Sequence, residues 1–182
     1  MRTEPQNSDI AERLRAGGVI AYPTEGVWGL GCLPGIEAAV IRVLELKSRP
    51  VDKGLILLGS AAEQFNSVAS GLAHDLPEPG DAPITYLVPH GDRVPFWIHG
   101  GSPKVAVRLT RHPIVVRLCE SVDAPLVSTS ANPASEPPAL SADDVERYFG
   151  TRLDAIVPGA LGGASGPSQI VDLESGEVVR PS

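Results

Sequence analysis

The sequence predicts an α/β fold in which flanking helices cover one mixed β-sheet. Strand and helix patterns interleave along the whole chain. Short apolar runs such as "VIAY" (19–22) and "LILL" (55–58) are typical of strands that are buried on both faces. Residues 169–179, "QIVDLESGEVV", read as a hairpin turning at Ser175–Gly176, which adds an antiparallel pair. With 182 residues, of which 42% are hydrophobic, the chain is long enough for one domain with a real core.

The first third of the chain predicts two helices around a strand. Residues 9–16 form a short helical pattern that stops at Gly17–Gly18, and the strand 19–22 follows. Between positions 34 and 46 the apolar residues fall at helical spacing, which predicts a second helix. Pro50 prevents its continuation.

The middle of the chain predicts three strands. After the strand 55–58, residues 66–83 give a weaker helix and then a loop. Residues 84–88 read as a strand, and 89–103 is a long segment rich in glycine, proline and aromatic residues. Residues 104–110, "KVAVRLT", alternate as a strand does, with Lys104, Ala106, Arg108 and Thr110 on one face.

The last third predicts two helices and four further strands. Pro113 opens a helix that runs to about Ser121, since proline is favourable at the first helical position. Residues 125–132, "PLVSTSAN", are a strand running into hydroxyl groups, and 155–157 is another strand before the terminal hairpin. Ser141 followed by Asp144 starts a helix that ends near Phe149.

Composition excludes several classes of protein. No apolar run approaches the roughly 20 residues that span a bilayer, and the N-terminus lacks the apolar core of a signal peptide, so a cytoplasmic location without membrane contact is expected. Cys32 and Cys119 are far apart, which suits a reducing compartment. The four histidines and two cysteines have no metal-ligand spacing, so no protein-bound metal is expected. The net charge of −7 argues against non-specific nucleic-acid binding over the whole surface.

Two glycine-containing motifs do not carry nucleotide or nucleophile chemistry, and a P-loop is absent from the sequence. "GLGCLPG" (29–35) has Pro34 where a dinucleotide-binding fingerprint needs its third glycine, and its glycines are expected to form a tight turn with positive φ. "GASGP" (163–167) ends in proline where a nucleophile elbow needs glycine. No lysine follows a P-loop glycine pattern, so any nucleotide is bound without one.

Cations and hydroxyl groups point to an anion-binding cleft. Lys47, Arg49 and Lys53 lie within seven positions, between a helix pattern and a strand pattern. Lys47 alone fits a cation at a helix C-terminus, but Arg49 lies beyond the helix. Arg108 interrupts a strand that is otherwise apolar, so it needs an anion from the protein or from a ligand.

The hydroxyl-rich segment "STSAN" has two interpretations. Ser, Thr and Asn are common in the turns that follow strands. In an extended segment, however, Ser128, Ser130 and Asn132 project to the same side, where α/β sheets bind ligands. Three polar groups on one side favour the binding site.

Five blocks in order give a resemblance to a known family. "VIAYPTEGVWGLGC", "LKSRPVDKGLILL", "VAVRLTRHP", "PLVSTSANPASEPP" and "GPSQIVDLESGEVVR" resemble the YrdC/TsaC family of threonylcarbamoyl-AMP synthases. The resemblance implies one YrdC-like domain over residues 1–182, with a core over about 8–180 and an open, twisted sheet. It also implies a reaction: L-threonine, bicarbonate or CO2, and ATP with Mg2+ give L-threonylcarbamoyladenylate and pyrophosphate. Partner proteins then transfer the threonylcarbamoyl group to tRNA, next to the anticodon.

The resemblance implies two groups of site residues. The threonine pocket would be lined by Thr24, Arg108, Ser128 and Ser168. ATP and its phosphates would be held by Lys47, Arg49, Lys53, Lys104, Ser130, Asn132 and Arg180. No residue is assigned as a covalent or general-base catalyst, because the chemistry depends on positioning and on neutralising phosphate charge.

The chain departs from the family pattern, and two other functions stay open. Many members have threonine at the position of Gly26, and asparagine and histidine at the positions of Lys53 and Leu58. The first alternative is a module that binds double-stranded RNA or tRNA without turnover, which the acidic balance and the 4% aromatic content support poorly. The second is a carbamoyl-transfer enzyme that is indifferent to threonine.

Overall fold

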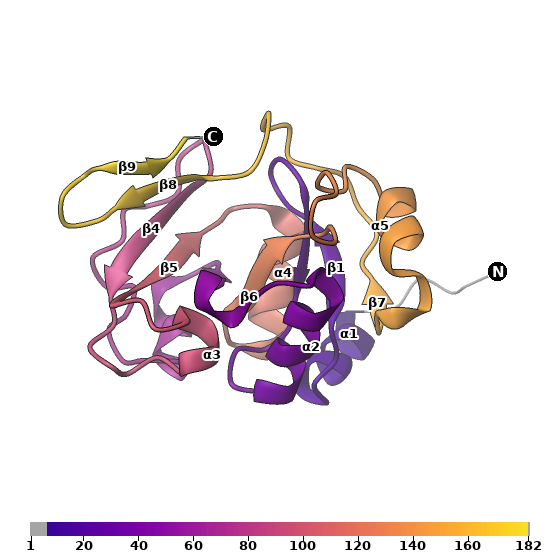
Figure 1. Ribbon diagram of the computed structural model, residues 1–182, viewed down its shortest axis with the longest axis horizontal. Helices are drawn as coiled ribbons and strands as arrows, with labels where there is room; N and C mark the ends of the chain where they lie inside the picture. Colours follow the sequence, from indigo (N-terminus) through magenta and orange to yellow (C-terminus); the bar gives the residue numbers. More distant parts are fainter. Residues whose placement is uncertain (1–6, 182) are drawn as a thin grey trace.

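The computed structural model describes residues 7–181, which build a nine-stranded sheet with the strand order β7-β1-β2-β6-β3-β5-β4-β8-β9 (Figure 1). Three neighbouring pairs are parallel (β1/β7, β3/β5 and β4/β8) and the others are antiparallel. The sheet is open, since β7 and β9 stand at opposite ends of this order. The prediction of a mixed, open α/β sheet is therefore confirmed.

The elements have the following bounds. The helices are α1 Asn7–Arg15, α2 Glu37–Lys47, α3 Phe96–His99, α4 Pro113–Val122 and α5 Ala142–Phe149, with short 3-10 helices at Val51–Lys53, Ala62–Ser67 and Gly150–Arg152. The strands are β1 Ile20–Pro23, β2 Trp28–Gly31, β3 Ile56–Gly59, β4 Ile84–Pro89, β5 Lys104–Leu109, β6 Leu126–Ser130, β7 Ala155–Ile156, β8 Gln169–Asp172 and β9 Val178–Arg180. None of the described helices is long and apolar enough to cross a membrane.

Each face of the sheet carries its own core. Leu57 and Val127 pack with α2, α3 and α5 on one face. Leu58 and Leu126, the neighbours of those two residues in sequence, pack with α1 and α4 on the other. Because side chains alternate along a strand, the same strands serve both cores, which gives three layers.

The expectation of a positive φ for the glycines of "GLGCLPG" was wrong, and only Gly35 of the three lies in a turn. Gly29 and Gly31 lie in β2, and neither has positive φ. A Cβ on Gly31 would lie 2.0 Å from the Val127 carbonyl oxygen, and one on Gly29 would lie 3.1 Å from the Tyr22 ring. These glycines therefore allow close packing inside the sheet rather than a turn.

Two segments also differ from the prediction. The helix expected at the start of 66–83 is absent from the described fold: a 3-10 turn over Ala62–Ser67 leads into further turns. The long segment 89–103 contains the short helix α3, which the sequence pattern did not indicate.

The sheet face that packs against α1 and α4 also carries the site. Leu58 pairs in register with Arg108 on β5, and Ile56 pairs with Ser128 on β6. Leu58 is completely buried under the helices, whereas Ile56 lines an open pocket. The helices thus cover one end of this face and leave the other end accessible.

Candidate active site

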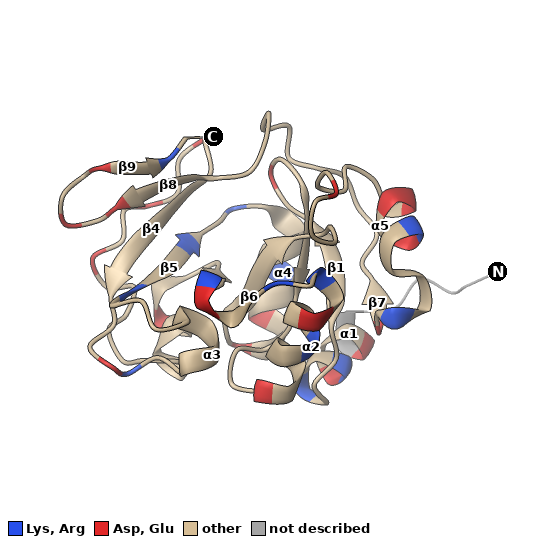
Figure 2. Cartoon of the chain, in the orientation of Figure 1, with Lys and Arg blue, Asp and Glu red and all other residues tan. Residues whose placement is uncertain are grey.

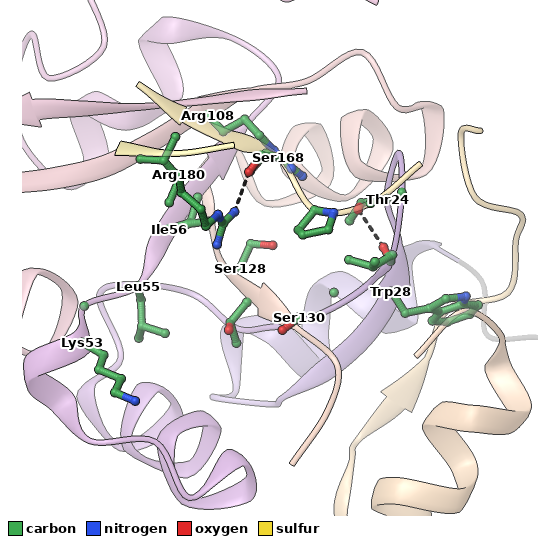
Figure 3. A pocket seen from close by; sticks show the side chains of 18 of the residues that line it. Thr24, Trp28, Lys53, Leu55, Ile56, Arg108, Ser128, Ser130, Ser168 and Arg180 are labelled. Atoms are coloured by element: carbon green, nitrogen blue, oxygen red, sulfur yellow. Dashed lines mark hydrogen bonds between the residues drawn. The ribbon is translucent and has the colours of Figure 1, made fainter. Parts of the chain in front are cut away.

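A large pocket lies over the uncovered part of this face (Figure 3). The cavity has a volume of about 180 Å³ and opens to solvent. Its walls come from the loop between β1 and β2, the segment before β3, strands β5 and β6, and the approach to β8 with β9. Segments far apart in sequence therefore meet around one cavity.

Eight of the eleven predicted site residues line this pocket. They are Thr24, Arg49, Lys53, Arg108, Ser128, Ser130, Ser168 and Arg180. Figure 3 shows Arg108, Arg180, Ser168 and Ser128 close together, with Lys53 at the opposite side of the cavity. The structure does not bring Lys47, Lys104 and Asn132 to the pocket lining.

The hydroxyl groups at the site are held by local hydrogen bonds. Thr24 Oγ1 donates to the Val27 carbonyl oxygen at 2.7 Å, which fixes it in the turn after β1. The Ser168 and Thr85 hydroxyl oxygens lie 2.7 Å apart, both buried. The phenol of Tyr22 lies completely buried beneath Ser128. Desolvation raises the pKa of this phenol, and a hydrogen bond with Ser128 offsets only part of the rise. The floor beside Ser128 therefore stays uncharged.

Arg108 is the most deeply buried cation of the lining. Its side chain is only 8% exposed, and its Nη2 lies 3.2 Å from the Glu25 Oε2. The anion that the sequence required for Arg108 is thus supplied in part by the protein. Arg108 Nε nevertheless has no hydrogen-bond partner in the described structure, so this arginine keeps a free donor.

Arg180 and Arg49 add further positive charge. Arg180 Nη2 donates to the Ser168 carbonyl oxygen at 2.5 Å, and burial followed by repulsion from Arg108 lowers its pKa. Arg49 donates to the carbonyl oxygens of Lys53 and Gly54, and burial followed by repulsion from Arg180 lowers its pKa. Arginine side chains stay protonated despite such shifts, so the pocket presents several mutually repelling positive charges. No aspartate or glutamate is among the lining residues.

Lys47, which was predicted to hold ATP, makes hydrogen bonds within the protein. Its Nζ donates to the carbonyl oxygens of Ser130 and Asn132 and to Asn132 Oδ1, at 2.5, 2.8 and 3.2 Å. Burial and then the charge of Arg49 lower the Lys47 pKa to about 8. Lys47 thereby ties the end of α2 to the end of β6, directly behind the pocket residue Ser130.

Asn132 does not extend the row of Ser128 and Ser130. Strand β6 ends at Ser130, and the Asn132 backbone N–H donates to the Ser130 carbonyl oxygen, with an N···O distance of 3.0 Å. The alternation that would place Asn132 on the same side stops with the strand. Its side chain instead bonds to Lys47 and donates to the carbonyl oxygens of Pro133 and Glu136.

Lys104 lies outside the pocket, at the start of β5. Its Nζ is 2.7 Å from both Asp172 Oδ2 and Glu174 Oε2. Figure 2 shows the acidic residues of the turn between β8 and β9 near this end of β5. The sequence could not reveal this arrangement, because the acidic partners lie about 70 positions away from Lys104 in the chain.

Sequence reasoning missed Glu25 and the contact between Gly26 and Gly166. Glu25 directly follows Thr24, and the need for an anion near Arg108 was the one signal that could have indicated it. A Cβ on Gly26 would lie 1.9 Å from the Gly166 carbonyl oxygen. Many family members have threonine at the position of Gly26. In this chain the Gly166 backbone fills the space that such a side chain would need.

Comparisons with known proteins identify the family of the chain. A family model described as "Telomere recombination", whose name joins Sua5, YciO and YrdC, matches residues 12–182. The chain is 55% identical to a threonylcarbamoyl-AMP synthase of Stutzerimonas stutzeri (strain A1501), over 95% of each chain. It is 50% identical to the protein of that name from Pseudomonas aeruginosa (strain UCBPP-PA14), over 94% of this chain and 95% of the relative.

Solved structures give the same result. P. abyssi Sua5 complexed with L-threonine superposes with a TM-score of 0.79 and 33% identity. The match covers 95% of this chain but 53% of that one, so this chain spans about half of that Sua5. From its fold and its relatives, the chain belongs to the Sua5/YciO/YrdC family.

Proposed function

We propose that this protein is a threonylcarbamoyl-AMP synthase, which converts L-threonine, bicarbonate or CO2, and ATP into L-threonylcarbamoyladenylate and pyrophosphate. The near full-length relatives of that name support this activity. One structural observation carries the proposal: a single pocket combines buried hydroxyl groups with four cationic side chains and has no acidic side chain in its lining. Such a lining suits a polyanion together with a small polar substrate.

The threonine end of the pocket is proposed to lie around Arg108. Its guanidinium would bind the substrate carboxylate, because a planar fork of N–H donors matches two carboxylate oxygens. Thr24, Ser128 and Ser168 offer hydroxyl groups beside it for the polar groups of threonine. A likeness to Sua5 complexed with L-threonine supports this placement.

The nucleotide is proposed to lie along Arg49, Lys53, Ser130 and Arg180. Arginine can hold phosphate oxygens in a bidentate manner, and the exposed Lys53 offers a mobile point charge. We propose that Mg2+ enters bound to the phosphates of ATP. In the described part of the chain no cluster of three or more histidine, cysteine, aspartate or glutamate side chains is placed to hold a metal.

The proposed chemistry requires positioning more than acid–base catalysis. The deprotonated threonine amine attacks CO2, which forms the C–N bond of a carbamate. A carbamate oxygen then attacks the α-phosphorus in line, and the bond to the pyrophosphate oxygen breaks. The side chains of the pocket would orient the two substrates and offset the negative charge of the phosphates.

The place of the protein in the cell follows from the same proposal. We propose that partner proteins pass the threonylcarbamoyl group to tRNA, next to the anticodon. ATP and tRNA are available in the cytoplasm, where we propose that the protein acts. Cys32 and Cys119 are both free and buried, in keeping with a reducing compartment.

Pyrophosphate release from ATP by the purified protein with Mg2+ tests the function. We expect release that requires both L-threonine and bicarbonate. Release without threonine would instead indicate another carbamoyl chemistry. No release under any condition, together with salt-sensitive retention of tRNA, would indicate an RNA-binding module and overturn the proposal.

A further inference from the structure

We infer that Glu25 is a positioning residue of this site, which holds the Arg108 guanidinium from behind so that its free N–H groups face the carboxylate of the substrate. The inference rests on the proposed function, because it assigns Arg108 to that carboxylate. Glu25 itself does not line the pocket, and Arg108 does. Arg108 thus has a protein carboxylate on one side and the cavity on the other.

The contacts of Glu25 fix its carboxylate. Thr110 Oγ1 donates to Glu25 Oε1 at 2.6 Å, and Arg108 Nη2 lies 3.2 Å from Glu25 Oε2. Thr110 is itself 1% exposed, and its hydroxyl oxygen accepts from the His112 backbone N–H at 2.9 Å. A chain of contacts therefore runs from His112, the residue before α4, through Thr110 and Glu25 to Arg108.

The hydrogen bonding of this cluster is incomplete. Within the described residues, the buried side-chain polar atoms without a partner are Glu25 Oε2, Arg108 Nε and His112 Nδ1. Buried polar groups are nearly always hydrogen-bonded, so three atoms without a partner in one cluster beside a pocket indicate that a ligand or an ordered water completes the cluster. Arg108 Nε is itself buried, so a ligand carboxylate in the cavity would bind the part of the Arg108 guanidinium that lines it.

The positive charges of Arg108 and Arg180 explain why a glutamate, Glu25, lies beside Arg108. Arg108 repels Arg180, as the lowered pKa of Arg180 indicates. An unpaired arginine would turn toward the nearest carbonyl group or solvent, since guanidinium groups seek acceptors. Glu25 lies outside the lining, so it can hold Arg108 without placing an acidic group against the carboxylate of the substrate.

The substitution Glu25→Gln tests the inference, because it keeps the size of the side chain and removes its charge. We expect the KM for threonine to rise by at least about tenfold, while the KM for ATP changes by less than about twofold. A merely structural role of Glu25 would lower the thermal midpoint and raise both KM values together. Such parallel rises, or an unchanged threonine KM, would overturn the inference.

Thr110→Val provides a second variant, which removes the hydroxyl donor to Glu25 together with the acceptor of the His112 backbone N–H. Thr110→Val should raise the threonine KM less than Glu25→Gln does. The threonine KM of the double variant should not exceed that of Glu25→Gln alone. Additive effects in the double variant would contradict the contact chain. Glu78→Gln is the matched control, since Glu78 lies near Glu25 at the surface but pairs with the exposed Arg111 at 3.4 Å. It should leave both KM values unchanged.

An NMR measurement separates this inference from the proposed function. The Arg108 Nε–H signal should be sharp in the wild-type protein and should broaden or exchange faster with water in Glu25→Gln. An unchanged signal would overturn the positioning role whatever the activity. If the wild-type protein shows no threonine-dependent turnover but this signal changes as expected, only the proposed function fails.

Discussion

Arg108 occupies a position on β5 that pairs in register with the buried Leu58 of β3. A charge so close to the core is stable only with an anionic partner. Glu25 supplies that partner at 3.2 Å, while Nε stays free on the same guanidinium. The arrangement lets one side chain serve both the fold and a ligand.

Arg108→Ala should impair threonine use selectively. Losing one partner of a buried charge pair typically costs about 2–5 kcal/mol, so we expect the threonine KM to rise at least about 30-fold, or activity to be lost. The circular dichroism spectrum should stay near that of the wild type. Arg108→Lys keeps the charge without the planar fork and should recover only part of the activity. A near-normal threonine KM in Arg108→Ala would contradict the assignment.

At position 26 the backbone of Gly166 leaves no room for a side chain. A Cβ there would lie 1.9 Å from the Gly166 carbonyl oxygen. The neighbouring backbone is held by hydrogen bonds from the Gly162 and Ala164 amides to the Thr24 and Glu25 carbonyl oxygens, at 3.0 and 2.9 Å. The segment before β8 is thus fixed against the loop that carries Thr24.

Gly26→Ala should therefore lower the free energy of unfolding by about 1–3 kcal/mol, as overpacking does, and should also weaken threonine use by displacing Ser168. Gly166→Ala is the control, since Gly166 is the other partner of this contact. A Cβ on Gly166 meets nothing within 4 Å, and the φ of Gly166 is not positive. Gly166→Ala should change stability by less than about 0.5 kcal/mol. Urea unfolding measures both values, and equal effects of the two variants would refute the steric argument.

At the scale of elements, ion pairs of Lys104 with Asp172 and Glu174 connect β5 to the hairpin of β8 and β9. Lys104 bonds to Asp172, and the Ser175 and Glu174 backbone amides also donate to the Asp172 carboxylate. These contacts, with that of Lys104 largest, lower the Asp172 pKa to about 2. Because this pKa is below the ordinary value, the contribution to stability is present above about pH 4 and is lost as the pH falls toward 2.

The carboxyl carbon signal of Asp172 should accordingly titrate near pH 2. In Lys104→Met its midpoint should move up toward the ordinary value for aspartate, whereas the backbone amides should keep it from reaching that value. Glu174→Gln leaves the Lys104–Asp172 contact in place and should shift the midpoint less. An unchanged midpoint in Lys104→Met would show that the contact is not formed in solution.

Helix α2 ends at a residue with an unfavourable backbone conformation. Ser48 follows Lys47 with φ 49°, in the left-handed region that favours glycine. Ser48→Gly should therefore raise the free energy of unfolding by about 1 kcal/mol. Ser48→Ala keeps a Cβ in the same conformation and should give no gain. A gain of equal size in Ser48→Ala, measured by urea unfolding, would point to the serine hydroxyl instead.

The sequence pattern identified elements better than it identified contacts between them. Ser141 was expected to begin a helix, and it caps α5 through a reciprocal pair of hydrogen bonds with Asp144. Strand β2 was missed because Gly29 and Gly31 have no strand preference, and the Tyr22 and Val127 contacts that require them are tertiary. Asn132 was misplaced for a related reason, since nothing in "STSAN" shows that pairing ends at Ser130.

At the scale of the whole molecule, the pocket joins the two ends of the described chain. Thr24 and Gly26 come from the loop after β1, while Ser168 and Arg180 come from β8, β9 and the segment before them. In the sheet, five other strands separate β1 from β8. Occupation of the pocket should therefore stabilise distant parts of the fold together.

Hydrogen exchange with an ATP analogue that resists cleavage after the α-phosphate tests this coupling. At a ligand concentration 100 times the Kd, the complex should be more stable by about 2.7 kcal/mol. Amide exchange should slow both at Gly26–Trp28 and at Gly166–Ser168, whereas the edge strand β7 should change little. Slowing at one wall alone would contradict a ligand that bridges both.

The hydrogen bond from Arg180 to the Ser168 carbonyl oxygen also has a consequence for protein synthesis. The ribosome adds Arg180 after every other residue of the pocket lining, so a growing chain can already pair Arg108 with Glu25 but cannot complete the wall formed by β9. Substrate binding can therefore assist only the last stage of folding, after strand β9 has left the ribosome. Chains stalled before that point would have to rely on the core beneath α1, α2 and α4 alone for their stability.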